Sequence, residues 1–317
     1  MNDLTPSPSP VVRPFSEEPA VTVPVFHPAV LPEDQTLFFP NAEGTPPTDP
    51  PTRIPHLGHA SLFAAIAALS LLFTQLLILG FSHPSKIAGK AAGTFSPKAL
   101  VGSEALAYIA TLGLSWFIFP LLWKRPFAEG LQLNPDAARR NAFRLIPIGL
   151  ILSLVVQAIS SLATMPKDIP MDDFFRTASD VWLVTAFGTL LAPLFEEVLF
   201  RGFLLPAFAI AYDWLSLPRS PGAREAWYAT NKLTRPALVF SAVLTSILFA
   251  ALHGYQTAFA WPVLALLFCV SLILSYIRLR LRSVFASTLV HVSYNATIFL
   301  FAFAATGGYC HLDKLTR

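Results

Sequence analysis

Several side chains that could carry out chemistry lie inside long apolar runs, where a charge is costly and usually has a function. They are two adjacent glutamates, one arginine, two histidines and one asparagine: Glu196, Glu197, Arg201, His253, His291 and Asn295. Carboxylates and imidazoles transfer protons, and an amide donates hydrogen bonds. A pocket that brings these groups together could activate water and stabilise an oxyanion.

Helical spacing separates the roles of the two glutamates. Glu197 and Arg201 are four residues apart, so they share a helix face and can form an ion pair. Glu196 is five residues from Arg201, about 140° around the helix, and is poorly placed for that pair. We therefore expect Glu197 to be neutralised structurally and Glu196 to be available as a general base.

The other polar residues follow the same spacing on two later runs. His291 and Asn295 project from one helix face, as do Phe249 and His253. Three helices could thus converge on one polar pocket. Two other interpretations stay open, because histidine and asparagine also join helices to one another in membranes, and acids with imidazoles also form proton paths in transporters.

The composition of the chain defines the environment of these residues. Of 317 residues, 54% are hydrophobic and only 13% are charged, against about 25% charged residues in an average soluble chain. This composition excludes a typical cytosolic enzyme and a disordered regulator, and two cysteines exclude a disulfide-stapled secreted domain. A net charge of +3 is too small for a nucleic-acid-binding surface. We expect a membrane protein with no nucleic-acid partner.

Apolar runs of spanning length predict an all-α fold, a polytopic membrane helical bundle of about seven spanning helices. The runs cover residues 59–81, 100–123, 145–165, 181–211, 237–255, 258–277 and 284–305. Eight spans are the alternative, and an eighth would move the C-terminus across the membrane. We find no internal repeat, so a carrier built from inverted halves gains no support.

Two features of these runs concern helix boundaries. The fourth run is too long for a hydrocarbon core of roughly 30 Å, so it must tilt, break near Pro193 or Pro206, or continue beyond the bilayer. His253 lies about 16 residues into its span, but His291 lies only about 7 residues into its own. We therefore expect either that the fifth helix starts later than 237 or that one boundary is wrong.

Residues 1–57 differ from the rest of the chain. They hold fourteen of the 28 prolines, and such a segment cannot bury enough surface to fold, so we expect a disordered Pro-rich tail. With seven spans, the side of the tail carries fourteen Lys and Arg residues and the opposite side carries seven. This excess predicts that the tail is cytoplasmic.

Three motifs follow one another on the last four predicted spans. They are Glu-Glu-x-x-x-Arg, Phe-x-x-x-His and His-x-x-x-Asn, which stand here as Glu196-Glu197-Val-Leu-Phe-Arg201, Phe249-Ala-Ala-Leu-His253 and His291-Val-Ser-Tyr-Asn295. In these motifs the sequence resembles the CPBP family of intramembrane endopeptidases. That family includes the type II CAAX prenyl proteases and bacterial proteins linked to bacteriocin processing or self-immunity. The resemblance covers roughly residues 181–305.

The resemblance implies peptide-bond hydrolysis within the membrane by a glutamate-activated water. In this view Glu196 and His253 activate the water, and His291 and Asn295 hold the developing oxyanion. The remaining motif residues support the site: Glu197, Arg201 and Phe249. No cofactor or metal is expected, although an older view of the family as zinc proteases is the alternative, since glutamate and histidine can ligate zinc.

The resemblance also implies the partners and the location of the protein. The substrate would be a membrane-associated peptide or protein, lipidated in the eukaryotic branch of the family, and the protein would lie in the lipid bilayer of a bacterial plasma (inner) membrane. The alternatives are a non-catalytic membrane scaffold, a bacteriocin self-immunity protein of the same fold, or a proton-coupled transporter.

The chain divides into four parts on these grounds. We expect residues 1–57 to be a disordered Pro-rich cytoplasmic tail and 58–180 to hold the N-terminal transmembrane helices. Residues 181–305 would form the catalytic transmembrane core that the resemblance implies, and 306–317 a short C-terminal tail.

Overall fold

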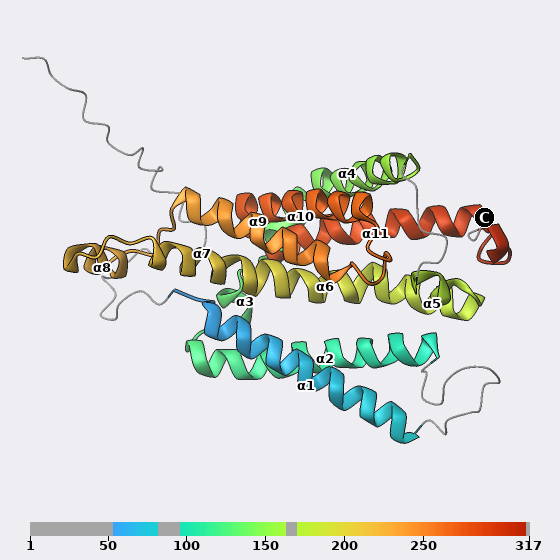
Figure 1. Cartoon of the computed structure of the whole chain (residues 1–317), viewed down its shortest axis with the longest axis horizontal. Coiled ribbons are helices and arrows are strands. Elements are labelled where there is room, and N and C mark those ends of the chain that lie inside the picture. The colour runs from blue at the N-terminus through green and yellow to red at the C-terminus, as the bar shows by residue number, and fades with distance from the viewer. Residues whose placement is uncertain (1–52, 82–95, 163–169, 315–317) are drawn as a thin grey trace, which may run out of the picture. The chain divides into compact units, whose positions relative to one another are not determined.

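A computed structural model describes residues 53–81, 96–162 and 170–314. Within these ranges the regular structure is helical, without strands, and seven helices are long and apolar enough to cross a membrane (Figure 1). The all-α bundle of seven spans is confirmed. The predicted disorder of the tail falls largely on residues 1–52, outside the described part of the chain.

The spanning helices keep the order expected from the sequence. Their bounds are α1 Leu57–Phe81, α2 Pro97–Trp123, α4 Pro135–Ser160, a long helix Ala178–Leu215, α9 Arg235–Leu252, α10 Trp261–Leu281 and α11 Val284–Ala305. Short helices lie between them or after them: α3 Phe127–Gly130, η1 Pro170–Phe175, α8 Pro221–Tyr228 and η4 Leu312–Lys314. Polar N-caps fix several of the starts. In each case the side chain accepts a hydrogen bond from a backbone N–H of the first turn, at Ser96, Asn134, Thr177, Thr234 and Ser283.

The long helix continues without a break through 38 residues, about 57 Å at 1.5 Å per residue, so it extends beyond a hydrocarbon core of roughly 30 Å. It consists of α5 Ala178–Ala186, the π-helical η2 Phe187–Leu191, α6 Ala192–Glu197, the π-helical η3 Val198–Leu204 and α7 Leu205–Leu215. Pro193 and Pro206 do not break it. Each proline is the second residue of an α-helical stretch that follows a π-helical one, so its missing N–H falls where the hydrogen-bond register changes.

Helix α11 lies at the centre of the packing and contacts α4, α6 and α10, while α1 pairs with α2 (Figure 1). The contact between α4 and α11 depends on Gly149. A Cβ at this position would lie 2.5 Å from Val290 O and 3.0 Å from Tyr294 N. The absence of a side chain therefore lets the two helix backbones touch directly next to His291.

The helices α9 and α11 begin at different levels of the bundle. α9 begins beside the end of α7, where Thr234 Oγ1 donates a hydrogen bond of 2.7 Å to Asp213 Oδ1. α11 begins beside the α3–α4 loop instead, where Val284 N donates to Gln132 O over 3.1 Å. The two starts are therefore displaced along the bundle axis.

The size of this displacement can be estimated on the long helix. The side chain of Leu131 in the α3–α4 loop lies 3.5 Å from the position that a Cβ of Gly202 would take. Gly202 precedes Asp213 by about eleven residues, or about 16 Å of helix. This length of helix nearly equals the difference in depth between His253 and His291, when each depth is counted from the start of its own helix. The expectation of a later fifth helix or a wrong boundary is therefore wrong. α9 begins at Arg235, and the axial offset compensates for its length.

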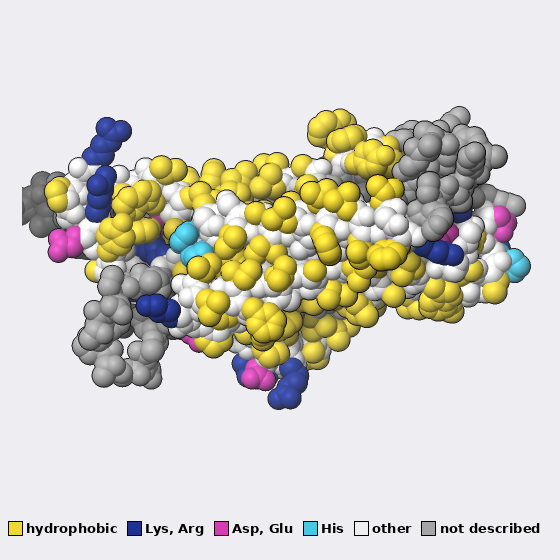
Figure 2. Space-filling model, turned by 90° about the horizontal axis from the view of Figure 1, so that it is seen from below, with side chains coloured by type: hydrophobic (Ala, Val, Ile, Leu, Met, Phe, Trp, Pro, Cys, Tyr) yellow, Lys and Arg dark blue, Asp and Glu magenta, His cyan; other side chains and the backbone are white. Residues whose placement is uncertain are grey.

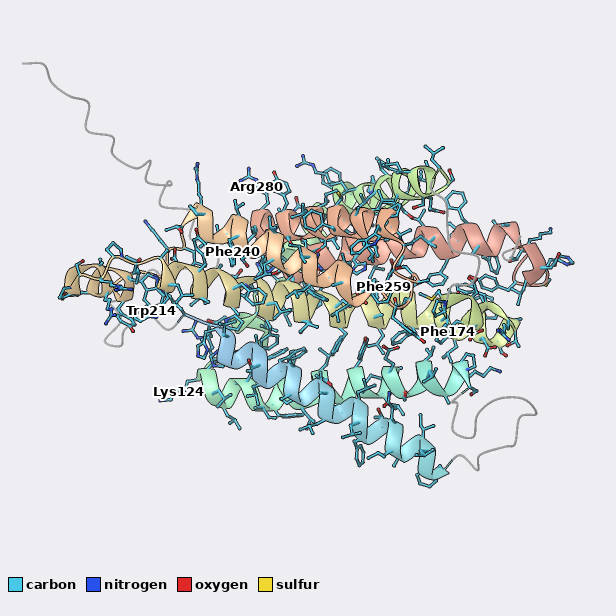
Figure 3. The ribbon with its side chains drawn as sticks, viewed as in Figure 1. Lys124, Phe174, Trp214, Phe240, Phe259 and Arg280 are labelled. Atoms are coloured by element: carbon cyan, nitrogen blue, oxygen red, sulfur yellow. The ribbon has the colours of Figure 1, made fainter. Side chains whose placement is uncertain are left out.

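Polar and apolar surfaces are distributed as a membrane requires. Lys124 and Trp214 lie at the end of the bundle where α1 begins, and Phe174 lies at the opposite end (Figure 3). The broad middle of the face in Figure 2 is hydrophobic, and Lys, Arg, Asp and Glu gather at its ends and lower edge. Large apolar side chains are exposed on the spanning helices, such as Phe73 on α1 and Phe117 and Leu121 on α2. The chain is a multi-pass membrane protein.

Candidate active site

Glu197 is the centre of an ionic cluster between the long helix and α11. Its side chain is completely buried, and its Oε1 accepts hydrogen bonds from Arg201 Nη1 over 2.9 Å and from His291 Nδ1 over 3.0 Å. The ion pair predicted from the four-residue spacing is thus present. The contact with His291 crosses between helices 94 residues apart in sequence, which the spacing alone does not predict.

Arg201 connects this cluster to α10. Its guanidinium is fully buried, and Nη2 donates to Ser271 Oγ over 2.7 Å and to Ser271 O over 2.9 Å. It also lies over the ring of Phe249, 5.0 Å from its centroid. Sequence reasoning missed Ser271, because a single serine within an apolar span is common and carries no distinctive spacing.

Glu196 has different surroundings from its neighbour. Its side chain is one-fifth exposed, and Oε2 lies 3.8 Å from His291 Nε2, beyond hydrogen-bond distance. Oε2 is buried and forms no hydrogen bond with any described residue. The expectation that Glu197 is paired structurally and that Glu196 remains without such a partner agrees with this geometry.

Two residues of α2 adjoin Glu196 from outside the motifs. Glu104 and Tyr108 both interact electrostatically with Glu196, and the Tyr108 hydroxyl donates to Glu104 Oε1 over 3.4 Å. The Tyr108 ring stacks on Phe195 with centroids 3.7 Å apart and an interplanar angle of 6°. Glu104 is an acid within an apolar run, and this is the signal in the sequence that could have placed it beside the site.

His253 follows the last residue of α9 and turns back onto its own helix. Its Nδ1 lies 2.8 Å from Phe249 O, and a carbonyl can only accept, so Nδ1 carries the proton and Nε2 keeps a lone pair in the neutral ring. The Phe249 ring lies between the two imidazoles, with centroids 4.7 Å from His253 and 5.9 Å from His291. Phe249 thus contacts both His253 and the His291 ring of the ionic cluster.

Asn295 lies on the same helix as His291 but binds a different level of the long helix. Its Nδ2 donates to Gly188 O over 2.6 Å. Gly188 belongs to η2, where π-helical geometry changes the carbonyl positions and is often found at functional sites. The structure thus brings His291 to the glutamates and Asn295 to the helix turn that precedes them.

The donor set does not suit a zinc ion with three protein ligands. Among the described residues, no group of three or more His, Cys, Asp or Glu side chains is arranged to hold a metal ion. Nδ1 of His291 is bonded to Glu197 and Nδ1 of His253 to its own helix, so only Nε2 of each ring remains as a possible ligand.

The fold and the cluster together define a multi-pass membrane protein with an ionic centre buried between its helices. Residues 178–297 match the family described as Type II CAAX prenyl endopeptidase Rce1-like, so this segment is similar to that family. All seven motif residues considered above fall in this segment, whereas Glu104 and Tyr108 precede it. No curated protein and no solved structure matches the chain.

Proposed function

We propose that this protein is an intramembrane endopeptidase that hydrolyses a peptide bond of a membrane-associated substrate with a glutamate-activated water. The observation that supports this most directly is the contrast between two adjacent carboxylates. Glu197 accepts hydrogen bonds from Arg201 and His291 on Oε1, and only its Oε2 has no partner, whereas Glu196 Oε2 is buried without a hydrogen bond and lies 3.8 Å from His291 Nε2. A carboxylate that is not engaged by the protein is available to accept a proton from water.

In the proposed reaction Glu196 takes a proton from water while the water oxygen bonds to the scissile carbonyl carbon. The carbonyl oxygen becomes an oxyanion in a tetrahedral intermediate. The carbon–nitrogen bond then breaks, and the proton passes from Glu196 to the departing amine. The products are a carboxylic acid and an amine, and no redox partner is needed.

Three further residues have roles in this scheme. The lone pair of His253 Nε2 helps to orient or deprotonate the water, because Nδ1 is fixed by Phe249 O. His291, as an imidazolium whose Nδ1–H is held by Glu197, stabilises the oxyanion through Nε2–H, and Asn295 does so through the Nδ2 hydrogen that Gly188 O does not accept, as preorganised donors do in acyl transfer. Glu197 and Arg201 do not touch the substrate; they fix the orientation of His291.

The family description suggests the class of substrate. A type II CAAX prenyl endopeptidase acts on a prenylated CAAX sequence, so we propose a membrane-associated peptide, lipidated near its C-terminus, as the substrate of this chain. We place the protein in the plasma (inner) membrane of a bacterium with its N-terminus in the cytoplasm, on the basis of the Lys and Arg distribution.

The test uses purified full-length protein in detergent with fluorogenic peptides, prenylated and unprenylated. Glu196→Gln keeps the size of the side chain and removes the base, so it should lower kcat by at least a thousandfold. Glu129→Gln, a change of the same type at an exposed position of α3, should leave kcat within twofold. Equal cleavage by wild type and Glu196→Gln would refute the proposed base. Absence of cleavage by folded wild type on both peptides would favour a non-catalytic scaffold.

A further inference from the structure

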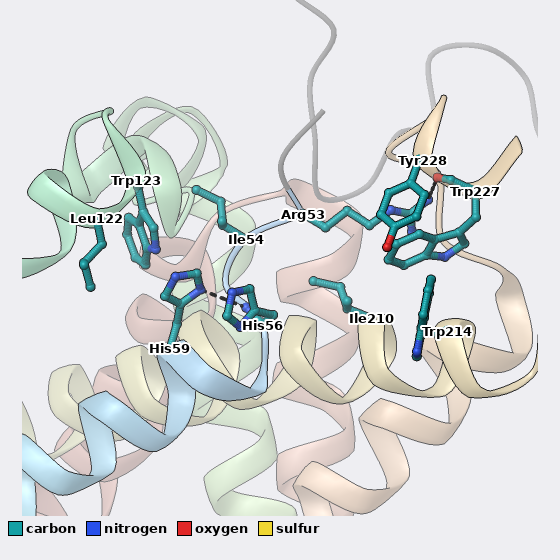
Figure 4. A pocket seen from close by; sticks show the side chains of 10 residues that line it. All are labelled: Arg53, Ile54, His56, His59, Leu122, Trp123, Ile210, Trp214, Trp227 and Tyr228. Atoms are coloured by element: carbon teal, nitrogen blue, oxygen red, sulfur yellow. Dashed lines mark hydrogen bonds between the residues drawn. The ribbon is translucent and has the colours of Figure 1, made fainter. Parts of the chain in front are cut away.

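A cavity lies at the end of the bundle where α1 begins, away from the ionic cluster. It has a volume of about 510 Å³ and is lined by the segment before and at the start of α1, the end of α2, α7 and α8 (Figure 4). Ile210 in its wall follows Glu196 by fourteen residues, about 21 Å of helix. The cavity is in the usual size range for small-molecule sites and is separate from the proposed catalytic residues.

Two adjacent imidazoles contribute hydrogen-bond donors to this cavity. The rings of His56 and His59 lie 3.7 Å apart between centroids. His59 Nδ1 accepts from His56 N over 3.2 Å, and His56 Nδ1 accepts from Gly58 N over 3.1 Å. An Nδ1 that accepts carries no proton, so the proton of each neutral ring is on Nε2. Burial lowers the pKa of His56, which favours this neutral form. Both rings therefore line the cavity with an Nε2–H donor.

A third donor in the wall lacks an acceptor from the protein. Trp123 Nε1 is buried and forms no hydrogen bond with described residues. The six-membered ring of Trp123 lies against Gly130, where a Cβ would be 2.4 Å from Cε3. The opposite edge, which carries Nε1, therefore faces away from Gly130. A buried donor without an acceptor destabilises the protein, so a ligand oxygen at Trp123 Nε1 would remove that cost.

The charge of the wall restricts the ligand further. Arg53 is held by Asp213, with Nη1 3.5 Å from Oδ2, and by the carbonyls of Trp227 and Thr230, which accept from Nη2 over 2.9 and 2.6 Å. Because one guanidinium is balanced by one carboxylate, the wall offers donors without a large net positive charge. This combination suits a group with one negative charge and several acceptor oxygens better than a multiply charged anion.

We propose that this cavity binds a phosphate group of the phosphodiester type, as carried by an anionic phospholipid at the membrane surface. His56, His59 and Trp123 supply the donors, Arg53 lies beside them with its charge balanced by Asp213, and the aromatic rings of Trp214 and Tyr228 line the remaining wall beside the non-phosphate part of the ligand. The position of these aromatic, histidine and arginine side chains at the ends of membrane helices matches the depth of lipid headgroups. The proposal does not depend on the proposed protease activity.

The test measures binding by isothermal titration calorimetry on the full-length protein in a phosphate-free maltoside detergent. The probes are short-chain phosphatidylglycerol, diacylglycerol of the same chain length, and inorganic phosphate. Phosphatidylglycerol should bind at least tenfold more tightly than diacylglycerol. His59→Phe and Trp123→Phe keep the rings and remove the donors, so each should weaken binding of phosphatidylglycerol at least fivefold.

Matched substitutions away from the cavity serve as controls. His311→Phe near the C-terminus and Trp116→Phe on the exposed face of α2 should leave the affinity within twofold. Displacement of the lipid by inorganic phosphate would show that the cavity also binds free phosphate. Lipid binding without phosphate binding would show that the cavity requires the lipid headgroup. Either result supports the proposed site. Equal affinity for diacylglycerol, or unchanged affinity in whichever of His59→Phe and Trp123→Phe folds, would overturn it.

Discussion

Gly149 provides a test of whether the position of α11 controls the proposed reaction. It lies on α4, outside residues 178–297, and its Cα touches the α11 backbone immediately before His291. Gly149→Ala adds one methyl group and removes no functional group. Any loss of activity would therefore arise from displacement of α11, and with it of His291 and Asn295.

The structure gives the magnitude of this displacement. The added Cβ would lie 2.5 Å from Val290 O, whereas ordinary contacts begin at 3.4 Å, so the helices must separate by about 0.9 Å at this point. The atom in the way belongs to a helix backbone, which cannot rotate aside. A displacement of about 1 Å can cost about a hundredfold in rate through loss of orientation, and overpacking costs about 1–3 kcal/mol of stability.

The assay compares kcat and KM of Gly149→Ala with those of Gly113→Ala. Gly113 lies in α2 with no atom within 4 Å of its added Cβ. Gly113→Ala therefore reports only the gain in helix stability that comes from replacing a helical glycine with alanine. We expect Gly149→Ala to lower kcat by ten- to a hundredfold with little change in KM, and Gly113→Ala to leave both within twofold. A folded Gly149→Ala protein with the kcat of wild type would refute the reasoning.

Other predictions concern the ionic cluster and the absence of a required metal. Arg201→Met should lower the free energy of unfolding by about 3–5 kcal/mol, because Glu197 becomes an unpaired buried charge; adding Glu197→Gln should restore most of the loss in denaturant titrations, and no rescue would contradict the explanation. Ser271→Ala removes an acceptor of a charged hydrogen bond and should cost about 1.5–3 kcal/mol, against near zero for exposed Cys269→Ala. Prolonged incubation with a zinc chelator should leave peptide cleavage within twofold of the untreated enzyme; complete loss that zinc reverses would overturn the metal-free scheme.

The spanning helices were largely predictable because hydropathy depends on the local sequence. The last run, 284–305, coincides with α11 at both ends. The third run, 145–165, misses the first turns of α4, which begins at Pro135 after the Asn134 cap. Those turns carry Arg139, Arg140 and Arg144, which lower the hydropathy although the backbone remains helical. Hydropathy thus detects the part of a helix that lies in lipid rather than the whole helix.

Contacts at the site were predictable where they lie within one helix and not where they join two helices. The ion pair between Glu197 and Arg201 follows from four-residue spacing on one helix. The contact of His291 with Glu197 and that of Asn295 with Gly188 depend on how the helices pack and on the π-helical geometry of η2. Neither packing level nor a π-helical turn leaves a signal in residue spacing, so the motifs identified the residues but not their partners.

The enclosure of the site explains why residues outside the family segment matter to it. A charged cluster within lipid needs neighbours that exclude lipid tails and fix its geometry. Segment 178–297 supplies Glu196, Glu197 and His291, but α2 supplies the acid Glu104 that interacts with Glu196, and α4 supplies the glycine contact that sets the height of α11. We therefore expect the first helices to belong to the functional unit. Changes at Glu104 of α2 and at Gly149 of α4 should alter kcat although neither residue belongs to a motif, as Gly149→Ala is designed to show.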